Sequence, residues 1–208
     1  VAPSIPGGSS MVGNGNRIVV ARDVCPDGTR WGDPGTFFEL VAYDPSLPEP
    51  EGTTLTTIEP DPSKVLFDDG TVVYSTDELV AGSISPSGAF VGVLEPVNTE
   101  QWRWHMYRTD VAGEPVVFGS GCESPGDIVG RPAFPSDDVV VLARRCSGAD
   151  GDDLYVEAVS LDDLQPIWSQ AVDGVEINSY TQAVDGVSAT DVDGELWVIV
   201  ASSGGVEQ

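Results

Sequence analysis

The only histidine of the 208-residue chain, His105, is where a nucleophilic catalytic site would have to form. Serine and cysteine nucleophiles of that kind need an imidazole as their general base. The segment 102–107 has strand-like alternation, which places Arg103, His105 and Tyr107 on one face. The two tryptophans and the methionine of this segment share the other face and are expected in the core. Neither a GxSxG nor an HExxH motif occurs. We therefore interpret Arg103, His105 and Tyr107 as a solvent-facing recognition surface, because Arg and aromatic residues dominate binding hot spots.

Acidic residues in two turns could hold a hard cation. Asp150, Asp152 and Asp153 stand in one turn, and carboxylates alternate through 191–195. Calcium prefers several oxygen ligands within one loop. The full calcium-loop spacing is absent, however, and Asp-Gly pairs also suit hairpin turns. We therefore expect no cofactor, with Ca²⁺ kept as the alternative and Asp150, Asp152 and Asp153 as its candidate ligands.

Paired carboxylates are also the catalytic groups of most glycosidases. The chain has 34 acidic residues, so some pair will lie at a suitable distance in any fold, and the sequence selects none. The glycine-rich segment 13–16 lacks the lysine and the following helix of a phosphate-binding loop. No catalytic residue is assigned.

Three cysteines indicate the redox environment. Cys122 and Cys146 lie on either side of the apolar run 139–143, so a chain that turns back would bring them together. A bridge between them would close a loop of 24 residues and add roughly 3 kcal/mol of stability. We predict this disulfide, which implies an oxidising compartment. Cys25 is then left over, and three unpaired thiols in a reduced protein are the alternative.

The net charge of −25, from 34 acidic and 9 basic residues, restricts the partners. Such a surface repels phosphate backbones and anionic lipid, so nucleic-acid binding is not expected. It favours a protein or cell-surface partner, in particular a basic one, although solubility alone also explains the charge.

The ends of the sequence suggest export. No stretch reaches the ~18 apolar residues of a membrane-spanning helix, so we expect no membrane insertion by this segment. Residues 1–10 are rich in Pro, Gly and Ser, which is typical of a flexible linker after a removed signal or a lipoprotein-like anchor. Residues 202–208 form a similar tail. We expect an extracellular or cell-envelope location.

Strand-like runs and turns fill the chain, and no ten-residue segment has helical periodicity. One unit contains a turn, an apolar run, a strand and an exit strand at 85–88, 89–94, 102–107 and 115–118. The same four parts recur at 135–137, 139–143, 154–156 and 166–168. A period of about 50 residues made of strands is typical of propeller blades.

Further strands flank this repeat. Before it come a hairpin at 11–21, strands at 37–43 and 53–58, and a hairpin at 65–74. After it comes a hairpin at 191–200, whose outgoing strand is apolar on both faces, as expected of a buried inner strand. We predict an all-β, antiparallel, propeller-like single domain over 11–201, with about four blades or a partial ring. A β-sandwich is the alternative.

The segment 83–94, with its Ser-Pro-Ser-Gly turn and apolar run, resembles the repeat of TolB-like and WD-type propellers. The resemblance covers 83–168. Ser87 stands where the family has Asp, and Asp137 stands where it has Gly. The resemblance implies a propeller that serves as a binding or scaffold surface, frequently in the cell envelope, and it carries over no catalytic residue.

Together these observations predict a non-catalytic secreted or cell-envelope domain, an accessory subunit or protein-interaction module. The alternatives are a carbohydrate-active propeller enzyme that uses acidic residues, and the sensor ectodomain of a membrane protein.

Overall fold

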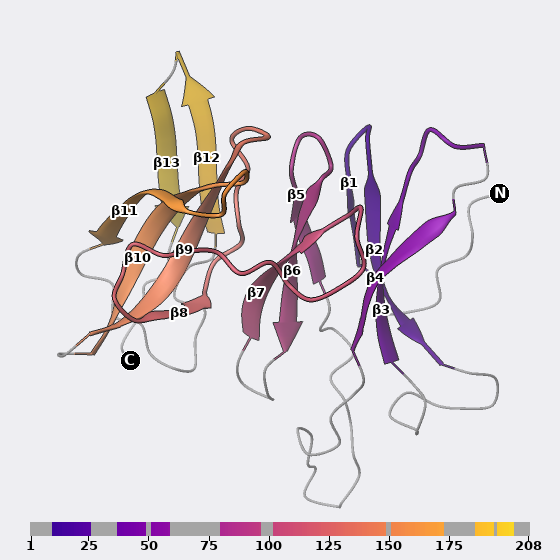
Figure 1. Cartoon of the computed structure of the whole chain (residues 1–208), viewed down its shortest axis with the longest axis horizontal. Helices are drawn as coiled ribbons and strands as arrows, with labels where there is room; N and C mark the ends of the chain where they lie inside the picture. The colour runs from indigo at the N-terminus through magenta and orange to yellow at the C-terminus, as the bar shows by residue number, and fades with distance from the viewer. Residues whose placement is uncertain are drawn as a thin grey trace, which may run out of the picture. The chain divides into compact units, whose positions relative to one another are not determined.

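The computed structural model describes residues 10–25, 37–48, 51–58, 80–96, 102–148, 151–172, 186–193 and 195–201. These residues form antiparallel strands and turns without a helix (Figure 1), which confirms the all-β prediction. The chain divides into two compact units. Unit 1 comprises Val1–Thr99 and Met106–Pro115, and unit 2 comprises Glu100–His105 and Val116–Gln208.

Unit 1 begins with a four-stranded antiparallel sheet in the order β1-β2-β3-β4. The strands are β1 (Ser10–Gly13), β2 (Ile18–Val24), β3 (Phe37–Tyr43) and β4 (Gly52–Ile58). The predicted hairpin at 11–21 and the strands at 37–43 and 53–58 are therefore confirmed. Each strand pairs with the next one along the chain because short turns join antiparallel neighbours.

A second group of strands in unit 1 has the order β7-β6-β5. The strands are β5 (Val80–Ile84), β6 (Phe90–Pro96) and β7 (Trp102–Arg108). Only residues 106–108 of β7 belong to this unit. Strand β5 was not predicted from the sequence. A core of fully buried apolar side chains joins the two groups, among them Val19, Leu40, Leu55, Val91 and Val93.

Unit 2 contains a sheet in the order β11-β10-β9-β8-β7, which includes the first half of β7. The other strands are β8 (Pro125–Ile128), β9 (Val139–Gly148), β10 (Gly151–Ser160) and β11 (Pro166–Val172). The predicted strands at 139–143, 154–156 and 166–168 are confirmed, whereas β8 was missed. Strands β9 and β10 form a long hairpin, paired from Val139 with Ser160 to Gly148 with Gly151.

The last hairpin corrects one expectation. β12 (Gly186–Val192) and β13 (Glu195–Ala201) pair only with each other within the described residues. The inner face of β13 packs on the unit 2 core through Leu196, Val198 and Val200. Trp197 and Ile199 point the other way and are 61% and 69% exposed. The prediction of a strand buried on both faces is thus wrong, because this two-stranded sheet is covered on one face among the described residues.

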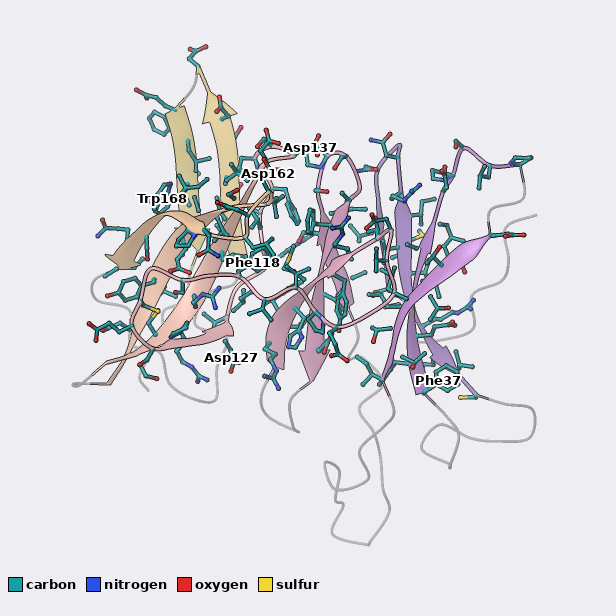
Figure 2. All side chains as sticks on the ribbon, viewed as in Figure 1. Phe37, Phe118, Asp127, Asp137, Asp162 and Trp168 are labelled. Atoms are coloured by element: carbon teal, nitrogen blue, oxygen red, sulfur yellow. A yellow bond between two sulfur atoms is a disulfide. The ribbon has the colours of Figure 1, made fainter. Side chains whose placement is uncertain are left out.

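The expected exit strand at 115–118 is also wrong, because this segment is an irregular coil. Phe118, labelled in Figure 2, is buried, but the preceding Val117 is 84% exposed. Just after it, the N–H of Gly119 donates to the carbonyl of Leu164 at 2.8 Å. The buried Phe118 side chain and this backbone hydrogen bond therefore hold the segment, in place of the hydrogen bonds of the expected strand. The hairpin predicted at 65–74 lies outside the described residues.

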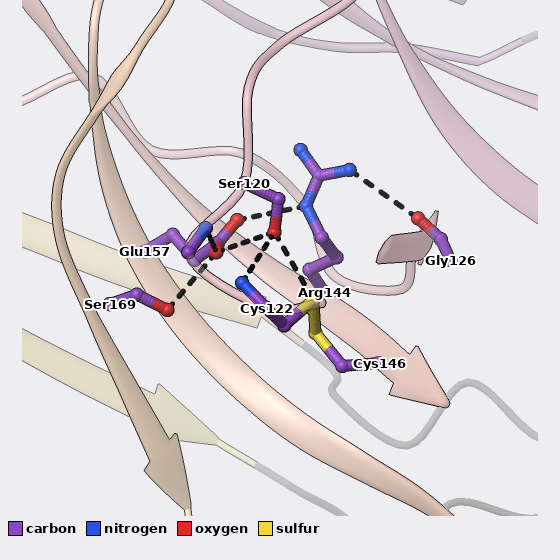
Figure 3. Close-up of polar contacts among 8 residues, drawn as sticks. Ser120, Cys122, Gly126, Arg144, Cys146, Glu157 and Ser169 are labelled. Atoms are coloured by element: carbon purple, nitrogen blue, oxygen red, sulfur yellow. Dashed lines mark hydrogen bonds and ion pairs between the residues drawn. A yellow bond between two sulfur atoms is a disulfide. The ribbon is translucent and has the colours of Figure 1, made fainter. Parts of the chain in front are cut away.

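Cys122 and Cys146 form the predicted disulfide, with their Cα atoms 6.2 Å apart. Cys25 is exposed and unpaired. The bridge ties the coil before β8 to the end of β9. Residues 120–122 therefore lie next to β10, and Ser120 and Gly121 contact its Glu157 (Figure 3).

Glu157 is a completely buried carboxylate in unit 2. Its Oε1 accepts hydrogen bonds from the hydroxyls of Ser120 and Ser169, at 2.8 and 3.0 Å, and from the N–H of Gly121 at 2.7 Å. Its Oε2 accepts from Nε of buried Arg144 at 2.8 Å. Four donors thus replace the water that this group loses on burial.

Asp23 in β2 makes the stability of unit 1 depend on pH. Its Oδ1 is buried without a hydrogen-bond partner among the described residues, and burial raises the pKa of Asp23 from 3.8 to about 6. Between these values the folded protein keeps a proton that the unfolded chain has lost, so stability falls as the pH rises. We expect Asp23→Asn to raise the free energy of unfolding at pH 7 by on the order of 1 kcal/mol, since solvent screens this partly exposed group.

The measurement is urea denaturation of wild type and Asp23→Asn from pH 4 to pH 7, monitored by the NMR signals of the β2 and β3 amides so that it reports on unit 1. The gain from the substitution should grow as the pH rises through this range and then level off. A gain that is the same at every pH would contradict the role given to the Asp23 carboxyl.

Candidate functional site

The residues predicted as a recognition surface occupy different environments. Arg103 is partly exposed and pairs with Asp127 at 3.5 Å, and His105 is partly buried. Tyr107 is only 3% exposed and belongs to the unit 1 core, so its expected place on a solvent face is wrong. Its hydroxyl donates to Glu95, and burial and this carboxylate raise the pKa of Tyr107. Partner binding by Arg103, His105 and Tyr107 stays a prediction.

The predicted calcium ligands lie at the β9–β10 turn. Asp150 is outside the described residues, as is the side chain of Asp152, whereas Asp153 is exposed opposite Cys146. Elsewhere in the described ranges, no group of three or more His, Cys, Asp or Glu could hold a metal ion. Calcium binding at this turn stays a prediction.

The site that the structure adds is a pocket of about 400 Å³ in unit 1. It lies where the β1–β2, β3–β4 and β5–β6 turns meet the segment that follows β7. Its lining consists of residues 15–17, Asp44, Ser46, 87–89 and 109–110. This volume is in the range of small-molecule sites, roughly 300–1,000 Å³.

Asn14 fixes the first of these turns. Its side-chain oxygen accepts from the N–H groups of Asn16 at 2.8 Å and Arg17 at 3.0 Å, which closes an Asx turn. Its Nδ2 donates to the carbonyl of Ser85 at 2.7 Å. Asn16 Nδ2 donates in the same way to Pro86, at 3.0 Å. Two side chains therefore join turns that are about 70 residues apart in sequence.

Gly88 and Thr109 fix the other side of the pocket. Gly88 has φ of +80°, and a Cβ there would lie 2.7 Å from Cγ of Arg17. Glycine is thus required both for the turn conformation and for the approach of the Arg17 stem. The Thr109 hydroxyl donates to the carbonyl of Gly88, and its N–H donates to the carbonyl of Ala89 at 2.9 Å.

Each carboxylate of the pocket is held by a cation. Arg17 Nη1 lies 3.0 Å from Asp44 Oδ2, and Arg108 binds Asp110 through two bonds of 3.0 and 2.8 Å. Hydrogen bonds from Ser46, and then Arg17, lower the pKa of Asp44. The Arg108 guanidinium lowers the pKa of Asp110. Both groups are therefore ionised at neutral pH.

This electrostatic arrangement favours binding over hydrolysis. A glycosidase needs one carboxyl whose pKa is raised, so that it can protonate the leaving group. Asp44 and Asp110 have lowered pKa values instead. No histidine or cysteine lines the pocket. What the pocket presents is a fixed set of hydrogen-bond donors and acceptors.

No family model, curated protein or solved structure matches the chain. Membership in the TolB-like or WD-type families therefore stays a prediction. Within the described residues, no helix has the length and apolar character to cross a membrane.

Proposed function

We propose that this chain is a non-catalytic binding domain of an exported protein, and that the turn-end pocket of unit 1 is its binding site. The observation that carries the proposal is the pairing of both pocket carboxylates, Asp44 and Asp110, with arginines. Such pairing fixes their positions before a ligand arrives, which reduces the entropy cost of binding. It also withdraws them from acid–base chemistry.

The disulfide supports the proposed location outside the reducing cytosol. Bridges such as Cys122–Cys146 persist in secreted proteins and in the cell envelope. The net charge of −25 suits a soluble or tethered domain.

We also propose a propeller-like arrangement for the all-β fold. The order β1-β2-β3-β4 is a four-stranded meander, the form of one propeller blade. We extend it to a propeller-like ring of about four blades, complete or partial. An experimental structure with the Pro86 and Pro135 turns on opposite layers of a sandwich would overturn this extension.

Blocking the pocket tests the proposed function. We expect wild-type protein to bind at least one class in a panel of neutral glycans, acidic peptides and basic peptides. Ser87→Trp should weaken that binding at least about tenfold, because an indole fills much of a cavity of this size. Binding can be measured by isothermal titration calorimetry, and folding by circular dichroism.

A matched control is available in the second repeat unit. The Ser136 hydroxyl accepts from the N–H two residues later, at 3.2 Å, as the Ser87 hydroxyl does at 3.3 Å. Ser136→Trp therefore changes an equivalent turn in unit 2 and should leave binding unchanged. Binding that survives Ser87→Trp, or a wild-type protein that binds no class in the panel, contradicts the proposal.

A further inference from the structure

We infer that the pocket binds a neutral saccharide, an inference that rests on the proposed function and specifies its ligand. The charges, the apolar content and the hydrogen-bonding groups of the lining each exclude or favour one class of ligand.

Anionic ligands are disfavoured by the state of the arginines. A phosphate or carboxylate needs a cation that is free to pair with it. Arg17 is engaged by Asp44, and Arg108 by both oxygens of Asp110. The net charge of −25 repels anions from the whole surface as well.

Cationic ligands are disfavoured because the carboxylates of the pocket are already paired. The two carboxylates are the groups that would attract an ammonium or a guanidinium. Both are already neutralised by the same arginines, and Arg17 itself lines the pocket. A basic peptide would have to displace a charge-assisted pair in order to bind.

Apolar ligands find little surface. Among the described residues of the lining, Ala89 is the one apolar side chain beside two glycines. Most drug-like and cofactor ligands need a lining that is mainly hydrophobic or aromatic. The described residues of the lining include no aromatic side chain on which a sugar ring could stack, so we expect weak binding of any sugar.

A sugar fits the groups that are present. Adjacent sugar hydroxyls donate and accept together, and a carboxylate has about four lone-pair sites. Asp44 Oδ2 faces Arg17, and Asp44 Oδ1 accepts from the N–H and the hydroxyl of Ser46, at 2.9 and 2.6 Å. These bonds hold Asp44 Oδ2 beside Arg17 Nη1, so an acceptor and a donor lie next to each other. Ser87, in the β5–β6 turn, and Thr109, in the segment that follows β7, also line the pocket, and each carries a hydroxyl group.

The inference predicts a change of specificity when Asp44 is replaced. The probes are neutral hexoses and N-acetylhexosamines, the corresponding uronates, and an arginine-rich hexapeptide, titrated into the full chain by saturation-transfer NMR. Wild type should bind one or more neutral sugars and bind the matched uronate at least about tenfold more weakly. Asp44→Asn releases Arg17, so neutral-sugar binding should fall about tenfold while uronate binding rises.

Asp163→Asn is the matched control, because the Asp163 side chain accepts from the N–H two residues later, as Asp44 does. It lies in unit 2 and should leave sugar binding unchanged. Circular dichroism verifies that both variants fold, and Ser87→Trp gives an independent loss of binding if Asp44→Asn does not.

The possible outcomes distinguish failure of the proposed ligand class from failure of the proposed function. Neutral-sugar binding that is lost in Ser87→Trp and shifted towards uronates in Asp44→Asn supports the inference. Binding of the basic peptide or of uronates alone, abolished by Ser87→Trp, overturns the ligand class but keeps the proposed function. No binding at all, or binding that Ser87→Trp leaves intact, overturns both.

Discussion

Replacing Glu157 with alanine is expected to lower the free energy of unfolding of unit 2 by about 3–5 kcal/mol. The substitution leaves the Arg144 side chain, which is only 9% exposed, without its counter-charge. Its Nη2 already lacks a hydrogen-bond partner among the described residues. The N–H of Gly121 and the hydroxyls of Ser120 and Ser169 also lose their acceptor. Each buried group left unsatisfied adds its own desolvation cost.

The measurement has to report on unit 2 alone, because a chain of two compact units need not unfold in one step. Hydrogen exchange of the β9 and β10 amides provides this local free energy. Asp127→Ala is the control, since Asp127 pairs with the partly exposed Arg103 and Arg145. It should cost at most about 1 kcal/mol. Equal losses in the two variants would mean that the Glu157 cluster is not a buried ion pair in solution.

The sequence could not indicate that Glu157 is buried. Alternation along β10 places Leu154, Val156 and Ala158 on the apolar face and Glu157 on the other, which would ordinarily be solvated. Residues 120–122 cover that second face through the hydrogen bonds from Ser120 and Gly121. This cover depends on tertiary placement of an irregular segment, which has no periodicity to detect.

Strand prediction succeeded where apolar alternation was bounded by turn residues, as in β2, β3 and β9. It failed for β5, whose five residues include a glycine, and for β8, which begins Pro-Gly. Both are short strands held by their neighbours: Ile128 of β8 pairs with Trp104 and with Arg144. Tyr107 was placed wrongly because both it and Met106 are buried, which strict alternation does not allow.

The pocket could not be predicted from the sequence either. The turn at 85–88 was recognised from its Ser-Pro-Ser-Gly sequence, and the Asn-Gly turn at 13–16 from its composition. Nothing in either segment shows that Asn14 bonds to Ser85, which is 71 residues away. The disulfide, by contrast, was predicted from the positions of Cys122 and Cys146 on either side of an apolar run. In the structure Cys122 precedes β8, and Pro125 of β8 pairs with Cys146.

The second large effect is expected from that disulfide. Replacing both Cys122 and Cys146 with serine should lower the free energy of unfolding of unit 2 by roughly 3 kcal/mol, because the bridge closes a loop of moderate length. We also expect the loss to be coupled to Glu157. Without the bridge, residues 120–122 can leave β10, so water reaches the carboxylate and the ion pair with Arg144 becomes a solvated one.

A double-mutant cycle tests this coupling. Glu157→Ala should cost about 3–5 kcal/mol in the oxidised protein but clearly less, about 1–2 kcal/mol, in the double-serine background. Cys25→Ser is the control, since this exposed thiol forms no bridge and its replacement should change neither value. Strict additivity of the two losses would contradict the coupling, because it would mean that the segment stays on β10 through its hydrogen bonds alone. The free energies can be obtained by hydrogen exchange with and without reductant, which also separates the loss of the covalent bond from the effect of the serine side chains.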